Sequence, residues 1–197
     1  MKQFLLGCML FCAIISLVMA ALPEQQSAPL FTAQASLAGK SFEYSLQEAL
    51  KKGAVVVYFY PSAFTGGCNI EAHEFAINHD KFSAAGASII GVSLDSIARL
   101  NDFSADPNYC AGKIAVASDV DGKIAKSYAI SVREAVAGKK DTRGVEINHR
   151  FAERTTFIVT ADGKIAATLS ALAPADNVSR ALEIVQKLDD EKKVDSW

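Results

Sequence analysis

The residues best suited to chemistry lie between Pro61 and Cys68, where a buried strand is expected to end and a helix to begin. Thr65 stands three residues before Cys68 and can hydrogen-bond either the sulfur or a substrate oxygen. The first turn of a helix presents unpaired backbone N–H groups and a partial positive charge, which stabilise an anion. We therefore expect the pKa of Cys68 to be lowered and its thiolate to be a nucleophile.

A helix start alone does not supply enough stabilisation for this thiolate. A free cysteine with a pKa of about 8.5 is only a few per cent ionised at pH 7. Lowering that pKa by about two to three units requires roughly 3–4 kcal/mol, and a helix N-terminus supplies about 1–2 kcal/mol at best. A second cation is needed, and Arg154, at the start of an expected strand, is the candidate.

These residues resemble the signature of the peroxiredoxin family. Pro61, Thr65 and Cys68 match its motif of Pro, three residues, Thr, two residues and Cys. The stretch that begins at Arg154 is similar to the family's later strand, which brings an arginine to the cysteine. Glu71 stands where the family commonly has a Glu or Gln that orients this arginine. The resemblance covers the whole domain, roughly residues 38–190.

The resemblance implies a thiol-dependent peroxidase that reduces hydrogen peroxide and organic hydroperoxides in antioxidant defence. Cys68 would attack the terminal peroxide oxygen, while Thr65 and the backbone N–H of Cys68 position the peroxide. Arg154 would stabilise the thiolate and the charge on the leaving oxygen, and Pro61 would shield the sulfur from water. The sulfenic acid formed on Cys68 must then be resolved by another thiol. A thioredoxin-like or other thiol reductant, no cofactor, no metal, and a monomer or homodimer are expected.

One departure from the family concerns this second thiol. By its length and its Gly66-Gly67-Cys68 loop, the chain resembles the bacterioferritin-comigratory, Q-type branch, many of whose members carry a resolving cysteine five residues after the first. That position is His73 here, so Cys110 is the candidate for the resolving thiol. The alternative is that Cys110 is a buried structural residue and that an external thiol completes a one-cysteine cycle.

Alternating strands and helices must position these residues. The unbroken apolar run Ala54–Tyr60 predicts a strand buried on both faces, and residues 87–93 predict a second one. A third strand, residues 154–160, continues through an Asp162-Gly163 turn into a hairpin. This order predicts an α/β, three-layer fold with a central mixed β-sheet and helices on both faces. The thioredoxin fold has this order, as do several other α/β folds.

Other segments are less regular in sequence. Residues 21–38 are expected to be an irregular lead-in to a thioredoxin-like domain at 39–197. The charge-rich residues 131–153 are expected to be a surface loop or a partly ordered excursion, with a solvated cluster from Lys139 to Arg143. The last helix should be capped by Asp176 or Asn177, and the polar tail from Asp189 is expected to fray.

The first twenty residues read as a secretory signal peptide. Lys2 carries the only charge, an apolar run follows, and small or modest side chains at 18–20 favour cleavage after Ala20. The alternative is an uncleaved membrane anchor, although the run is short for spanning a bilayer. We expect an exported protein, periplasmic or secreted, which has no membrane association after cleavage.

Charge and cysteine count limit the other functions. The formal net charge of −2 and the lack of a basic, aromatic-rich patch argue against nucleic-acid binding. Cys8 and Cys12 would leave with the signal peptide, so Cys68 and Cys110 could also form a structural disulfide in a non-enzymatic domain.

Two thiol chemistries on the same fold fit less well. A thiol–disulfide oxidoreductase needs a second cysteine where Glu71 stands, and a copper chaperone needs one where Ala72 stands. His73 and His79 are poorly spaced for one metal site on a helix.

Overall fold

The interior strand β3 (Ala54–Phe59) is buried along its whole length, as its apolar sequence predicts. A computed structural model describes residues 21–195, so the predicted signal peptide, residues 1–20, lies outside the described residues. Successive side chains of β3 enter two separate hydrophobic cores. Val56 and Tyr58 belong to one core, and Val55 and Val57 to the other, because side chains alternate between the faces of a sheet.

Seven strands form one mixed sheet, namely β1 (Thr32–Leu37), β2 (Lys40–Ser45), β3, β4 (Ala87–Ser93), β5 (Ala115–Ser118), β8 (Thr155–Val159) and β9 (Ile165–Ser170). Their order across the sheet is β2-β1-β5-β4-β3-β8-β9. The pairs β3–β4 and β4–β5 are parallel, and the remaining neighbours are antiparallel. Two short strands, β6 (Val132–Arg133) and β7 (Phe151–Ala152), pair separately.

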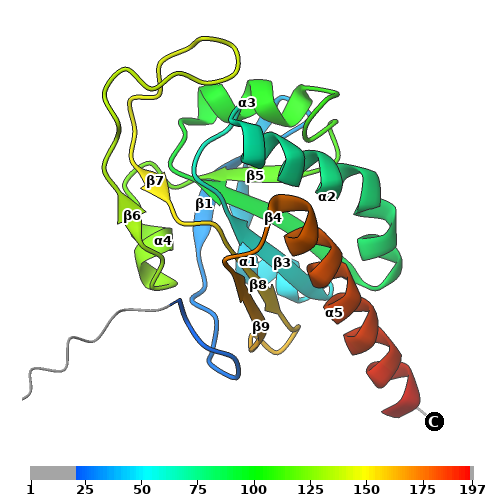
Figure 1. Ribbon diagram of the computed structural model, residues 1–197. Helices are drawn as coiled ribbons and strands as arrows, with labels where there is room; N and C mark the ends of the chain where they lie inside the picture. The colour runs from blue at the N-terminus through cyan, green and yellow to red at the C-terminus, as the bar shows by residue number, and fades with distance from the viewer. Residues whose placement is uncertain (1–20, 196–197) are drawn as a thin grey trace, which may run out of the picture.

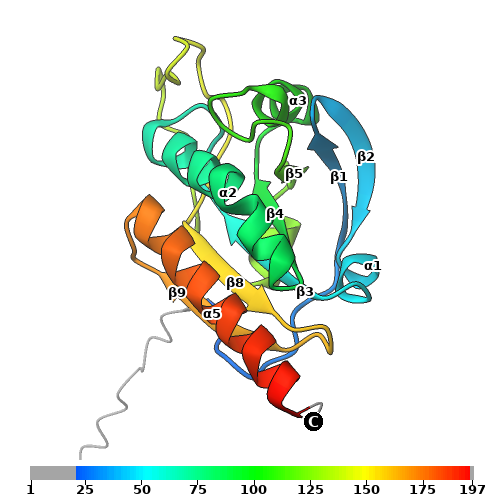
Figure 2. The same ribbon diagram turned by 90° about the vertical axis from the view of Figure 1, so that its right-hand side faces the viewer.

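Helices cover both faces of this sheet (Figures 1 and 2). The helices are α1 (Leu46–Leu50), α2 (Gly66–Ala84), α3 (Ile97–Ala105), α4 (Lys123–Ser127) and α5 (Pro174–Asp195). Side chains of α2, α3 and α5 join the core that contains Tyr58, while those of α1 and α4 join the opposite core. The predicted three-layer α/β architecture is therefore confirmed.

The expectation of an irregular lead-in is wrong for residues 32–37, which form β1. This strand lies inside the sheet, paired with β2 on one side and with β5 on the other. Residues before β1 are also hydrogen-bonded to the rest of the domain. Gln25 N donates to the Ile165 carbonyl at 2.8 Å, and Ala28 N donates to the Gly163 carbonyl at 2.9 Å. These bonds place residues 25–28 beside the β8–β9 turn and the first residue of β9.

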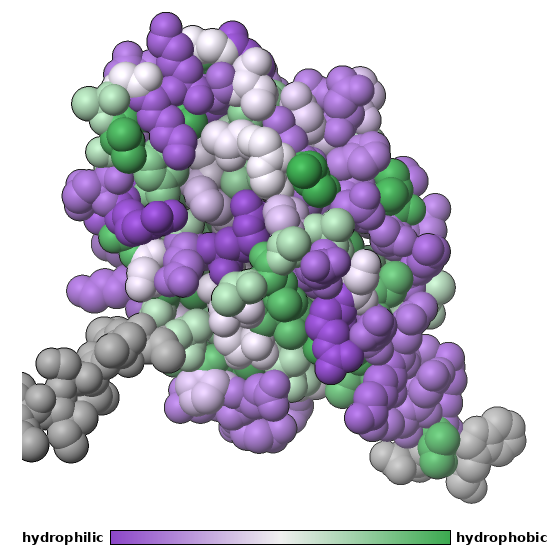
Figure 3. Space-filling view, in the orientation of Figure 1, coloured by the Kyte–Doolittle hydropathy of each residue, from purple (hydrophilic) through white to green (hydrophobic). Residues whose placement is uncertain are grey.

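The last helix is longer at both ends than its sequence predicts. It begins at Pro174, so Asp176 and Asn177 lie inside its first turn rather than at its cap. Proline suits a first helical position because its missing N–H would be unpaired there. The predicted fraying from Asp189 is also wrong: the helix continues to Asp195, and Lys193 pairs with Asp189 at 2.6 Å. This end of α5 forms a strongly hydrophilic surface (Figure 3).

Of the two alternatives for the segment between β6 and β7, the structure favours the partly ordered excursion over the surface loop. Asp141 and Ile147 within it are 7% and 2% exposed, so the expectation that the cluster from Lys139 to Arg143 is solvated is wrong for Asp141. Its carboxylate accepts from the backbone N–H groups of Arg143 and Val145 within the same segment, and it also pairs with the distant Arg99. Among residues 21–195, no helix combines the length and apolarity needed to cross a bilayer.

Candidate active site

Cys68 lies in the first turn of α2, as predicted. The chain leaves β3 at Phe59, bends at Pro61, and enters the helix after Thr65, the N-cap residue. The Thr65 hydroxyl donates to the Ser62 carbonyl at 2.8 Å, which fixes the turn that precedes the helix. Cys68 is only 2% exposed, so its sulfur faces the protein interior.

Strand pairing brings Arg154 to this sulfur. Arg154 directly precedes β8, whose first residue, Thr155, pairs with Phe59 at the end of β3. Its Nη2 donates to Cys68 Sγ at 3.4 Å, and its Nη1 forms an ion pair with the buried Glu71 carboxylate. The structure thus brings together the cysteine, the arginine and the glutamate that the sequence singled out.

Asn177 is a member of the site that the sequence analysis did not identify. Its Nδ2 donates to Glu71 Oε1 at 2.7 Å and to Thr156 Oγ1 at 2.8 Å. Asn177 is 2% exposed, and it fixes the carboxylate that in turn holds Arg154. The only sequence signal for this residue was its place near the start of the last helix, where it was interpreted as a cap.

The pKa of Cys68 does not follow the prediction. Burial raises it above the ordinary thiol value, and the Arg154 charge together with hydrogen bonds from the Ser62 backbone and Thr65 offsets this only in part. Burial likewise raises the pKa of Glu71, to about 7, against the opposing influence of Arg154 and Asn177. One guanidinium therefore serves two buried acids, which cannot both ionise at low cost.

Gly67 leaves room for this guanidinium. A Cβ at position 67 would lie 3.2 Å from Arg154 Nη2 and 3.3 Å from Pro174 Cγ. Both contacts are tighter than ordinary van der Waals packing, so a side chain here would displace the arginine or the start of α5. The glycine in the predicted Gly66-Gly67-Cys68 loop thus has a steric reason.

Cys110 lies in the turns after α3 and is completely buried. Burial, with a smaller contribution from the Asp106 charge, raises its pKa far above the ordinary thiol value. It shares one hydrophobic core with Cys68, and both are free thiols in the structure. The fully buried hydroxyls of Tyr58 and Tyr60, in the same core, have no hydrogen-bond partner among the described residues.

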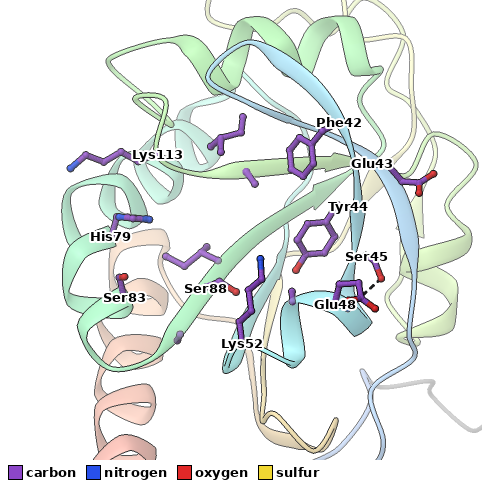
Figure 4. A pocket seen from close by; sticks show the side chains of 15 residues that line it. Phe42, Glu43, Tyr44, Ser45, Glu48, Lys52, His79, Ser83, Ser88 and Lys113 are labelled. Carbon is purple, nitrogen blue, oxygen red and sulfur yellow. Dashed lines mark hydrogen bonds between the residues drawn. The ribbon is translucent and has the colours of Figure 1, made fainter.

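The pocket in Figure 4 lies away from these residues. It has a volume of about 410 Å³ and lies between the far end of α2 and the β1–β2 hairpin, with Tyr44 and Phe42 on one side and His79 and Lys113 on the other. His79 is about 16 Å further along α2 than Cys68, at 1.5 Å per residue. None of the predicted site residues lines this pocket.

No metal centre accompanies the site among the described residues. Within residues 21–195, no three or more His, Cys, Asp or Glu side chains are grouped so that they could hold a metal ion. The expectation that the chemistry uses neither metal nor cofactor remains a prediction.

Comparison with known proteins gives the family. Residues 25–168 match the model of the AhpC/TSA family. The chain belongs to this family. The putative peroxiredoxin bcp of Coxiella burnetii is 32% identical to this peroxiredoxin over 142 residues, 72% of this chain and 84% of the relative. Peroxiredoxin Bcp of Bacillus subtilis is 27% identical over 136 residues, 69% of this chain and 80% of the relative.

Solved structures agree with this assignment. The bacterioferritin comigratory protein of Xanthomonas campestris superposes with a TM-score of 0.65 at 25% identity, covering 86% of this peroxiredoxin and 99% of that chain. Peroxidoxin BcpB of Mycobacterium tuberculosis has a TM-score of 0.70 at 22% identity, covers 84% and 97% of the two chains, and supports the fold. The chain is a Bcp-like, Q-type peroxiredoxin, a thiol-dependent peroxidase, and the non-enzymatic alternative is not favoured.

Proposed function

We propose that Cys68 is the residue that attacks the peroxide in this peroxidase. The observation that carries the proposal is the 3.4 Å hydrogen bond from Arg154 Nη2 to Cys68 Sγ, at the start of a helix. Arg154 is itself held by Glu71, so its charge is fixed before any substrate arrives. A fixed charge aimed at the reacting atoms costs no reorganisation during the reaction.

The first step is a displacement at oxygen. The Cys68 thiolate donates an electron pair to the terminal peroxide oxygen, the S–O bond forms, and the O–O bond breaks. The leaving oxygen takes the electron pair and a proton, giving water or an alcohol and leaving Cys68 as a sulfenic acid. Arg154 is placed to stabilise the thiolate and the departing oxygen. Because Thr65 donates to Ser62 in this structure, its hydroxyl would have to turn in order to donate to the peroxide.

Because Cys68 is buried, its thiol must be deprotonated before this step. The pKa of Cys68 is raised in the closed site, so the proton must leave the thiol before attack. Glu71, with a pKa of about 7, can exchange protons near neutral pH and competes with the thiolate for Arg154. We infer that attack proceeds from the ionisation state in which Arg154 faces the Cys68 thiolate.

The second step, in our proposal, is resolution by Cys110. The Cys110 sulfur attacks the sulfenic sulfur, a disulfide forms, and water leaves with the sulfenic oxygen. A dithiol of the thioredoxin-like class then reduces the disulfide. The shared core of Cys68 and Cys110 supports this pairing. Because Cys68 opens a helix and its sulfur is held by Arg154, the bond requires local unwinding around Cys68.

Substitution of Cys68 tests the first step. Cys68→Ser should abolish peroxide consumption in the presence of a dithiol reductant, whereas Cys110→Ser should retain a single turnover. A Cys68→Ser protein that still consumes peroxide at the wild-type rate would refute the assignment.

Mass spectrometry after one equivalent of peroxide tests the second step, resolution by Cys110. Persistent sulfenic acid on Cys68 without an intramolecular disulfide would remove Cys110 from the cycle.

We also propose that the protein is exported and cleaved after Ala20. The first residues beyond this point make contacts of their own, because Thr168 Oγ1 donates to the Leu22 carbonyl at 2.6 Å and Leu22 N to the Tyr128 carbonyl at 3.3 Å. A chain beginning at Ala21 keeps both bonds. Expression of the full chain in a bacterium should give periplasmic or secreted protein whose N-terminal sequence begins at Ala21, and full-length protein in the membrane fraction would contradict this.

A further inference from the structure

The segment between β6 and β7 holds the loop that precedes Cys68. Thr142 donates twice to the Phe64 carbonyl, from its backbone N at 2.8 Å and from Oγ1 at 2.9 Å. The Arg143 guanidinium lies 3.3 Å from the centre of the Phe64 ring. Phe64 is thus held through its carbonyl and its ring by residues almost eighty positions further along the chain.

A buried aspartate ties down the residues just before Phe64. Asp95 is fully buried, and its carboxylate accepts from Ala63 N at 2.8 Å and from Ser62 Oγ at 3.0 Å. Asp95 is held in turn by His149, whose Nε2 lies 2.8 Å from Asp95 Oδ1. Arg99 connects the two ends of the arrangement, because it pairs with Asp95 at 2.8 Å and with Asp141 at 2.8 Å.

His149 is placed to work as a cation. Its Nδ1 lies 2.7 Å from the Arg150 carbonyl and its Nε2 faces Asp95, so only the doubly protonated ring donates to both acceptors. The side chain is about one-fifth exposed, so solvent protons can reach it. A positive His149 strengthens the hold on Asp95, since hydrogen bonds between charged partners are stronger than neutral ones.

The loop of residues 62–65 has a backbone conformation that needs contacts from the rest of the protein to maintain it. Phe64 has a φ of +58°, in the left-handed region that bulky residues rarely occupy. Its ring is 1% exposed and packs against Phe103 and Tyr109, with centroids 5.0 and 5.6 Å away. Surrounding contacts must therefore maintain this conformation. The same loop controls Cys68, because the Ser62 backbone hydrogen-bonds the sulfur and the Ser62 carbonyl accepts from Thr65.

We propose that Asp141, Thr142, Arg143 and His149, which we call the clamp, keep the loop of residues 62–65 closed around Cys68, and that His149 is a positioning residue that sets how readily this loop opens. The clamp favours reaction with peroxide, because the closed loop keeps Cys68 beside Arg154. It opposes disulfide formation, because Cys68 must leave Arg154 to meet Cys110. The second half of this inference rests on the proposed resolving role of Cys110.

The clamp should weaken as pH rises. Burial alone lowers the pKa of His149, and Arg99 also lowers it, but the hydrogen bond and charge of Asp95 outweigh both and raise it above the ordinary value. Asp95 and Arg99 are the charged groups that face the ring, and Phe151 packs beside it at 5.7 Å. The hold is therefore complete below the ordinary histidine pKa of about 6.5 and is lost as pH rises through the raised folded-state value.

Four variants of the full mature chain test the clamp. His149→Leu removes the ring donors, His149→Gln keeps a neutral donor, and His79→Leu is the matched control because His79 contacts Asp80 on the far part of α2. Thr142→Val, which removes one hydroxyl contact to Phe64, is a milder variant should His149→Leu fold poorly. Three rates are measured at pH 6 and pH 8: amide hydrogen exchange at residues 62–68 in the reduced protein, oxidation of Cys68 by hydrogen peroxide, and formation of the Cys68–Cys110 disulfide.

The clamp predicts opposite changes in the two chemical steps. His149→Leu should exchange residues 62–68 roughly ten- to a hundredfold faster, the range for losing a hydrogen bond to a charged group. It should react more slowly with peroxide and form the disulfide faster, and Thr142→Val should change the three rates in the same directions by less. His149→Gln should lose the pH 6 to pH 8 difference in exchange rate, and His79→Leu should match the wild type.

Other outcomes overturn the inference. Unchanged exchange and unchanged rates in both His149→Leu and Thr142→Val would show that the clamp does not hold the loop. Peroxide oxidation and disulfide formation that slow together would make His149 merely structural. If the wild type forms no intramolecular disulfide, the proposed role of Cys110 fails instead, and the exchange and peroxide rates alone decide whether the clamp exists.

Discussion

Cys68 and Cys110 are buried to nearly the same extent in one hydrophobic core, yet their surroundings differ. Burial raises the pKa of both thiols. Around Cys68, Arg154, Thr65 and the Ser62 backbone oppose that effect, whereas at Cys110 the nearby Asp106 charge adds to it. Equal burial therefore leaves two different thiols, because groups that oppose the rise in pKa surround Cys68 alone of the two. The neighbouring charge and the polar loop decide which sulfur can ionise.

Removal of the Arg154 charge should have the largest effect on the difference in reactivity between Cys68 and Cys110. We expect Arg154→Met to slow the reaction of Cys68 with hydrogen peroxide by about 10²–10³-fold, the usual cost of losing one preorganised donor at a reacting oxygen. Stopped-flow fluorescence measures this rate. Arg180→Met is the control, because Arg180 is exposed on α5 and its ion pair within residues 21–195 is with Glu183. An Arg154→Met protein as fast as this control would mean that another group distinguishes the two cysteines.

The competition between Glu71 and Cys68 for one guanidinium gives a second prediction. In the wild type, Glu71 ionises as pH rises through about 7, and its negative charge then disfavours the nearby thiolate. Glu71→Gln removes that charge, so the pKa of Cys68 should fall and its alkylation at pH 7 should speed up several-fold. The pH profile of iodoacetamide alkylation measures the change. A profile shifted to higher pH would show that the ordering of Arg154 by Glu71 matters more than the competition.

Substitution of Cys110 should lower the stability of the protein more than substitution of Cys68, although Cys68 is the more reactive thiol. Cys110→Ser buries a hydroxyl in apolar surroundings and should lower the free energy of unfolding by about 1–3 kcal/mol. Cys68→Ser should cost less, because Arg154 and Thr65 offer the new hydroxyl polar partners. Urea unfolding of both variants measures the difference. Equal losses would mean that the polar surroundings of Cys68 do not extend to its side-chain oxygen.

The smallest expected effect concerns the tyrosines in the core that the two thiols share. Tyr58 has a fully buried hydroxyl without a hydrogen-bond partner among the described residues, so Tyr58→Phe should raise the free energy of unfolding by up to about 1 kcal/mol. Tyr128→Phe is the control: its hydroxyl donates to the Pro29 carbonyl at 2.9 Å, and its loss should destabilise the protein. A stabilised Tyr128→Phe or a destabilised Tyr58→Phe protein would contradict this view of the core.

Much of the site could be predicted because its signals are local. The apolar run of β3, the bend at Pro61 and the spacing of Thr65 and Cys68 all lie within fifteen residues, and Arg154 opens a recognisable buried strand. Local patterns predict local structure, and strand pairing then brings Arg154 to Cys68. For this reason the α/β class and the pairing of Cys68 with Arg154 could be inferred from the residues, whereas the thioredoxin fold and the role of Glu71 came from the resemblance to the family.

The parts of the site that the sequence did not predict depend on contacts between residues far apart in the chain. Asn177 holds Glu71 across a separation of 106 residues, and His149 holds Asp95 across 54. A polar residue near a helix start looks the same in sequence whether it caps the helix or binds a distant carboxylate. The direction of the Cys68 pKa shift was wrong for a related reason: burial is a property of the packed core, and the motif gave only the opposing influences.

The hydrogen bonds of residues 25–28 to the β9 hairpin have a practical consequence. They cover the β8–β9 turn and the first residue of β9, at one border of the seven-stranded sheet. Uncovered strand borders promote association between copies of a chain. A protein shortened to begin at residue 30 would uncover this end of β9, and light scattering should show it aggregating at lower concentration than the chain that begins at Ala21.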